Sequence, residues 1–140
     1  MLDKERILGK IDELDAYLKE LNQIIPKNFE EYQKIEKKRS CERLIQLCIE
    51  CVIDICKLFV AGLRLGLPSE ENDLLKKIKK QGIISSKMYS TLREMRGFRN
   101  ILIHEYVTID DKIVFETLNA KLEDFQKFKE EILTALKKLK

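Results

Sequence analysis

Four side chains around residue 100 could together act on a phosphate. Arg99, Asn100, His104 and Tyr106 lie within eight residues, and His104 is the only histidine among 140 residues. Arginine offers a planar, permanently charged fork that fits a phosphate, and histidine gives or takes a proton near neutral pH. Tyrosine adds a hydroxyl, and the asparagine amide can orient a neighbour. Metal-independent RNA cleavage needs such groups: a base takes the 2′-hydroxyl proton, a cation stabilises the phosphate, and an acid protonates the leaving oxygen.

The spacing of the arginine and the histidine sets a geometric condition. Arg99 and His104 are five residues apart, which is about 140° around an ideal helix. They share one face only if the helix distorts or ends near His104. One chain supplies one such histidine, whereas two copies related by a twofold axis would bring two to one cleft. The chemistry therefore favours a homodimer, and so does the apolar segment 44–63, which predicts burial on most faces of its helix.

The segment leading into these residues is strongly basic. Leu74–Arg99 contains eight basic residues and one acidic residue, so it carries +7, and the remainder carries −4 because the chain has a net charge of +3. Such a region would attract RNA or another polyanion. Charge alone, however, favours the alternative of a solvated, lysine-rich helix surface.

Apolar residues at spacings of three and four predict the helices that position the motif. Asn28, Ser85 or Ser86, and Asp110 or Asp111 are the candidate N-caps, because their side chains can accept hydrogen bonds from the first helical turn. The predicted helices cover about 2–24, 28–65 with a possible kink, 70–80, 86 into the motif, and 111 to the C-terminus.

These elements predict an all-α fold, an up-and-down bundle of about five helices in one domain covering residues 1–140. Only five glycines and two prolines interrupt the chain, which favours long helices. The charged first residues lack the apolar core of a signal peptide. No apolar run reaches the roughly 18 residues typical of a membrane span. We therefore expect a cytoplasmic protein with no membrane association.

Two further patterns lie in the second predicted helix. Cys41, Cys48, Cys51 and Cys56 lie within 16 residues. Their helical spacing predicts core packing, because the Cys-x-x-Cys pair has no second pair to complete a zinc site. Cysteines used in this way indicate a reducing compartment. The other pattern is a polar stripe along one side of the helix, which faces either water or a functional groove: Gln46, Glu50, Asp54 and Lys57.

The motif and its flanks resemble a known family. Arg99-x4-His104-x-Tyr106, with Asn100 after the arginine, is similar to the R-x4-6-H signature of HEPN domains and, more narrowly, to the R-x4-H-x-Y form of the HepT-like toxins. The resemblance covers roughly residues 40–135. Further matching segments are Gln46-x3-Glu50-x3-Asp54-Ile55, Gly66-Leu67-Pro68, Gly82-Ile83-Ile84-Ser85 and Gly97-Phe98-Arg99-Asn100.

The resemblance implies a HEPN-like bundle that dimerises and acts as a metal-independent endoribonuclease, the toxin of a type VII toxin–antitoxin system. Arg99 and His104 match the active-site positions, Asn100 matches a supporting position, and Glu50 or Asp54 could orient Arg99. The implied partner is an MntA-type nucleotidyltransferase antitoxin, which adenylylates Tyr106 with ATP and magnesium that the partner binds. A bulky anion beside the cleft would repel RNA phosphate and silence the site.

A non-catalytic role remains the alternative. A lone histidine near the end of an apolar helix is more often a hydrogen-bonded core residue than a catalyst. Proteins of this type have also been regarded as substrate-binding subunits of nucleotidyltransferases. The basic stretch and the motif would then bind a nucleotide or the partner and cleave nothing.

Overall fold

The computed structural model describes residues 1–104 and 110–139, which contain helices and connections but no strand. The predicted all-α fold is therefore confirmed for this part of the chain. The helices are α1 (Lys4–Ile24), α2 (Phe29–Tyr32), α3 (Ile35–Gly62), α4 (Glu71–Lys80), α5 (Ser86–Ile103) and α6 (Asp111–Lys138).

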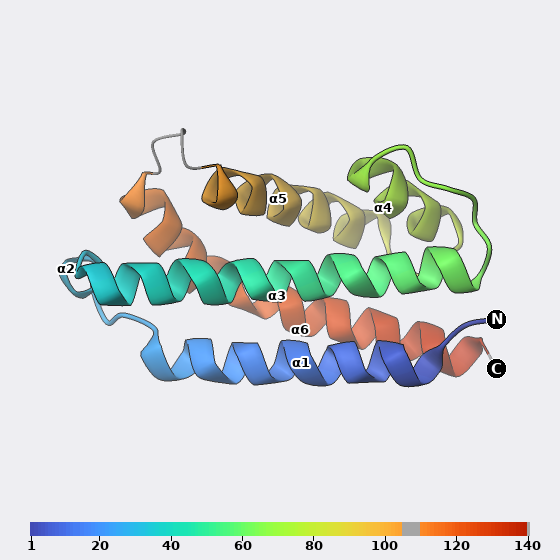
Figure 1. The fold of residues 1–140 in the computed structure, drawn as a ribbon, viewed down its shortest axis with the longest axis horizontal. Coiled ribbons are helices and arrows are strands. Elements are labelled where there is room, and N and C mark those ends of the chain that lie inside the picture. The colour runs from blue at the N-terminus through green and yellow to red at the C-terminus, as the bar shows by residue number, and fades with distance from the viewer. Residues whose placement is uncertain (105–109, 140) are drawn as a thin grey trace.

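The long helices run up and down around α3, as Figure 1 shows. Helix α1 lies on one side of α3, and α4 and α5 lie on the other side. Helix α6 passes behind α3 and also contacts α1, because Nζ of Lys129 lies 2.8 Å from a carboxylate oxygen of Asp15. Helix α3 is thus the central element, as its nearly all-round apolar sequence predicts.

Side-chain caps fix the starts of several helices. Asn28 accepts a hydrogen bond of 2.8 Å from the Glu31 amide, and Ser85 accepts one of 3.0 Å from Met88. Asp110 accepts one of 3.0 Å from Lys112. These caps confirm Asn28 and select Ser85 and Asp110 from the predicted alternatives. The Ser85 cap sets where α5, the helix that carries the motif, begins.

The predicted helix over 28–65 is wrong in one respect, because the chain breaks at Gln33 and Lys34 into α2 and α3. The break lets α2 turn its aromatic residues into the core. The rings of Phe29 and Tyr32 lie 5.8 Å and 6.0 Å from that of Phe115 on α6. Tyr32 is fully buried. Packing between distant segments, not a local breaker, therefore ends the helix here.

The core draws on every helix, and the four cysteines belong to it. All four are free thiols buried among apolar side chains, so their predicted packing role is confirmed. Burial raises the pKa of the Cys48 thiol to about 12 and that of Cys51 to about 11. No group of three or more potential metal ligands occurs among the described residues. None of the described helices is both long enough and apolar enough to cross a membrane.

Candidate functional site

The motif lies where α5 ends. Arg99 lies just before its last turn, Asn100 begins that turn, and His104 is its C-cap, with φ −91° and ψ 98°. The chain therefore leaves the helical path at His104. This meets the geometric condition of the five-residue spacing, because the imidazole is not held 140° away from Arg99 on a continuing helix. His104 is exposed.

Two neighbours hold the guanidinium of Arg99. Its Nε donates to Oδ1 of Asn100 at 3.1 Å. Its Nη2 donates to Oε1 of Glu71, the first residue of α4. The Arg99 side chain is only 11% exposed, so neighbouring residues cover most of it. Described residues engage two of its five N–H groups, which leaves capacity to bind a phosphate.

Glu71 accepts hydrogen bonds from two arginines. Nε of Arg96, one turn before Arg99, lies 3.0 Å from the same Oε1 atom. One carboxylate therefore stands between two guanidinium groups, and the three side chains together keep a charge of +1. Glu71 also lies in the first turn of α4, where the helix dipole favours a negative charge.

In the described residues neither Glu50 nor Asp54 contacts Arg99, and the expectation that one of them orients it stays a prediction. Glu50 accepts a hydrogen bond of 2.9 Å from Gln46, and Asp54 pairs with Lys10 of α1 at 3.4 Å. The acidic partner of Arg99 comes from α4, not from α3. The sequence reasoning missed Glu71, because its only local signal was an acid in the first turn of a short helix.

Tyr106 lies outside the described residues, so its predicted role stays a prediction. Asn100 lies beside Arg99, as the sequence suggested. The described part of the motif thus brings a fixed arginine and an exposed histidine to the same end of α5.

The basic stretch of the sequence divides between two helices. Arg96 and Arg99 meet Glu71 at the start of α4. At the other end of α4, Nζ of Lys79 lies 4.7 Å from the ring centroid of Tyr89, near the start of α5. Helices α4 and α5 are therefore antiparallel neighbours. The positive charge predicted around the motif is thus divided between α4 and α5.

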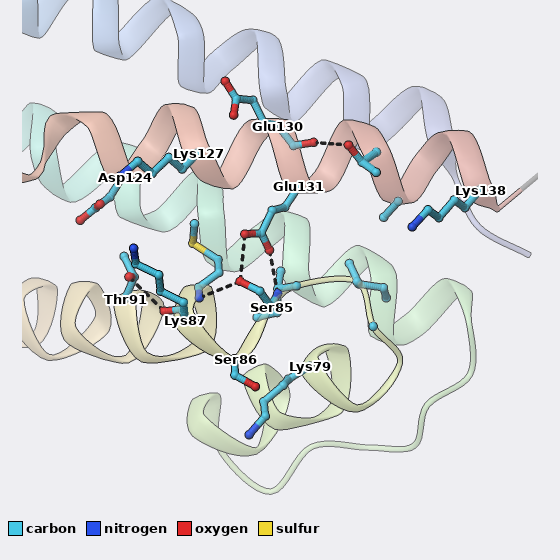
Figure 2. Close-up of a pocket in the computed structure, with 16 residues that line it drawn as sticks. Lys79, Ser85, Ser86, Lys87, Thr91, Asp124, Lys127, Glu130, Glu131 and Lys138 are labelled. Carbon is cyan, nitrogen blue, oxygen red and sulfur yellow. Dashed lines mark hydrogen bonds between the residues drawn. The ribbon is translucent and has the colours of Figure 1, made fainter.

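A groove lies at the end of α5 opposite to the motif. It has a volume of about 710 Å³, and neither Arg99 nor His104 lines it. Figure 2 shows Glu131 of α6 reaching across it to Ser85. Glu131 accepts hydrogen bonds from the backbone N–H of Ser85 at 2.7 Å and from its hydroxyl at 3.0 Å. This contact ties α6 to the start of α5, and so serves the fold.

Comparison with known proteins finds a matching family model and related proteins. The family model described as Ribonuclease HepT-like matches residues 14–132. The mRNA nuclease HepT of Shewanella oneidensis is 27% identical over 122 residues, covering 87% of this chain and 92% of that protein. The tRNA nuclease HepT of Aphanizomenon flos-aquae is 25% identical over 117 residues, covering 83% of this chain and 80% of that protein.

A solved structure shares the fold. It is that of the tri-AMPylated Shewanella oneidensis HEPN toxin in complex with MNT antitoxin. It superposes with a TM-score of 0.85 at 26% identity, and covers 91% of this chain and 96% of that one. The bundle and its helix order are thus those of a toxin that carries AMP and binds an antitoxin.

Proposed function

Because the chain belongs to the Ribonuclease HepT-like family, we propose that it is an endoribonuclease, the toxin of a type VII toxin–antitoxin system. The observation that carries this proposal is the Arg99 guanidinium, fixed by Asn100 and Glu71 beside the helix end at His104. A cation held beside a proton-transfer group is what cleavage of a phosphodiester requires.

The residues support cleavage by the 2′-hydroxyl of the RNA. One His104 imidazole takes the 2′-hydroxyl proton, and the 2′-oxygen attacks the adjacent phosphorus. The bond from phosphorus to the 5′-oxygen breaks, and that oxygen takes a proton from a second imidazolium. Arg99 stabilises the negative charge on the phosphate oxygens. The products are a 2′,3′-cyclic phosphate and a 5′-hydroxyl, and no step calls for a metal ion.

The second imidazolium comes from a second copy of the chain. His104 is the only histidine in the sequence, so one copy cannot supply both imidazoles. The end of α5 also exposes apolar side chains that a neighbour could cover, because Ile101 is 46% exposed and Ile103 is 41% exposed. We therefore assign the active site to the cleft of a twofold homodimer.

Tyr106 is the residue through which we propose that the site is silenced. The AMP carried by the related HEPN toxin, bound to an MNT antitoxin, supports an MntA-type nucleotidyltransferase partner that adenylylates this tyrosine. ATP and magnesium would be bound by the partner, and RNA cleavage itself would need neither. Mass spectrometry after co-expression tests the assignment. AMP on Tyr106 is expected, and an unmodified tyrosine with full neutralisation of toxicity would refute it.

A ribonuclease assay in the presence of a chelator tests the proposed activity. Wild type should cleave RNA, whereas Arg99→Ala and His104→Ala should not. Arg43→Ala is the matched control, because Arg43 is an exposed arginine of α3 without a described polar contact. If pure wild type binds the nucleotidyltransferase but cleaves no RNA, the chain is a binding subunit and the toxin assignment fails.

A further inference from the structure

A basic groove lies along α4, outside the residues assigned to catalysis. We call it the α4 groove. Its volume is about 730 Å³, and it is lined by five basic side chains: Arg64, Lys76, Lys77, Lys79 and Lys80. Arg64 comes from the turn after α3, and the four lysines come from α4. The groove therefore gathers cations from two separate elements.

The charge of the α4 groove is largely uncompensated. Its acidic residue is Asp73, which accepts a hydrogen bond of 3.0 Å from the Ser69 amide and lies 3.9 Å from Nζ of Lys77. In the described part of the chain, no carboxylate pairs with Arg64, Lys76 or Lys80. Surface lysines are often merely solvated. The backbone conformation of Arg64 gives an independent reason to infer that these charges bind a ligand.

Arg64 occupies a backbone position that favours glycine. Its φ of 53° lies in the left-handed region, where most side chains clash with the backbone. The position follows the C-cap of α3, and Leu65 N donates to Val60 O at 3.0 Å, the bond that closes a Schellman motif. A glycine would fit this position without strain. The backbone disfavours an arginine here, so its presence at this position points to a use for its cation.

The α4 groove lies along the same short helix whose first residue holds Arg99. Because α4 and α5 are antiparallel, Glu71 at one end of α4 meets Arg99. Lys79 and Lys80 are at the other end. The ten residues of α4 span about 15 Å. An RNA strand bound at Arg99 could therefore run along α4, where its phosphates would meet several cations in turn.

We propose that the α4 groove binds the sugar–phosphate backbone of the RNA substrate to one side of the scissile bond. This inference rests on the proposed ribonuclease function. The basic side chains are cations, and Tyr89 in the groove is only 8% exposed as a whole residue, which leaves little ring surface for stacking a base. Binding there is consequently directed at phosphates, is largely independent of sequence and weakens with salt.

Binding of a fluorescent single-stranded RNA at several salt concentrations tests the groove. The measurements use His104→Ala protein, so that the RNA stays intact. Adding Lys76→Ala and Lys80→Ala should weaken binding severalfold and lower the salt slope by about 1.4, because each phosphate contact contributes about 0.7. The matched control is Lys19→Ala with Lys27→Ala, which removes two exposed lysines from α1 and the connection that follows it, on the other side of α3 from α4. An unchanged slope in the groove variant overturns the proposal.

Arg64→Gly separates binding from folding. It should raise Tm by a few degrees, because it removes the left-handed strain, and yet lower the salt slope by about 0.7. Weaker binding by a more stable protein cannot be attributed to unfolding. Loss of binding to the nucleotidyltransferase, with RNA binding intact, would overturn the proposal in favour of a protein-docking surface.

The two proposals fail in different ways. If intact wild type cleaves RNA and the groove variants bind RNA as it does, the groove assignment alone fails. If wild type binds RNA with the predicted loss in the groove variants but cleaves none, the catalytic assignment fails and the groove stands. For active wild type, the groove variants should raise KM for long RNA and leave kcat unchanged.

Discussion

Nη2 of Arg99, near the end of α5, donates a hydrogen bond to the carboxylate of Glu71, the first residue of α4. The same carboxylate also holds Arg96. The short helix α4 thus fixes Arg99, the proposed catalytic cation, from a distance of 28 residues along the chain. An element that looks like a simple connection between α3 and α5 therefore supports the proposed site.

Glu71→Gln should lower kcat about tenfold, because a neutral amide holds the Arg99 fork less firmly and the phosphate is then less well placed. KM should change little. The adjacent Glu70→Gln is the matched control, since Glu70 is an exposed residue that makes no side-chain capping bond. Steady-state kinetics on one RNA substrate compares the variants. Equal kcat values for Glu71→Gln and Glu70→Gln would show that Glu71 does not position Arg99 for catalysis.

Glu131→Ala should lower the free energy of unfolding by about 1 kcal/mol, because the N–H and hydroxyl of Ser85 both lose their carboxylate partner. Thermal unfolding measures the loss. Glu130→Ala is the matched control, since Glu130 is the exposed neighbour on α6 and its side chain makes no contact with Ser85 (Figure 2). If both variants unfold at the same temperature, the contact between α6 and the start of α5 contributes nothing.

The buried thiols should make the fold sensitive to alkali. Burial raises the pKa of Cys48 from 9.0 to about 12. The unfolded chain therefore releases this proton above pH 9, while the folded chain keeps it. Stability is full below pH 9 and falls as pH rises toward 12, with a slope approaching about 1.4 kcal/mol per pH unit for this thiol.

Urea unfolding between pH 8 and pH 10.5 measures this dependence. Cys48→Ala should be less stable than wild type at pH 8, because it leaves a small cavity. Its stability should decline less steeply above pH 9, since one buried thiol has been removed. Parallel curves for the two proteins would mean that Cys48 does not contribute to the alkaline loss.

Local patterns were enough to predict the helices and the place of the motif. The apolar spacing identified α1, α5 and α6, and short polar side chains identified Asn28, Ser85 and Asp110 as caps. Such features depend on neighbours within a turn or two of helix. The thiols of α3 were also predictable, because their positions repeat with the period of a buried helix face.

Long-range contacts were not predictable in the same way. No glycine or proline marks the break after Tyr32, which arises because α2 packs its rings on Phe115 of α6. The partner of Arg99 likewise depends on the antiparallel alignment of α4 and α5. That alignment placed Glu71 at the motif, whereas the family resemblance had suggested Glu50 of α3.

The measurement closest to the central claim is the RNase activity of mixed dimers. Wild type and His104→Ala are unfolded together in equal amounts, refolded, and assayed with a chelator present. If each cleft needs a His104 from both copies, random pairing leaves about one quarter of the activity of the same total amount of wild type. Mixing wild type with Arg43→Ala should preserve full activity. About one half of the activity would show that each copy cleaves RNA alone, and would contradict the shared site.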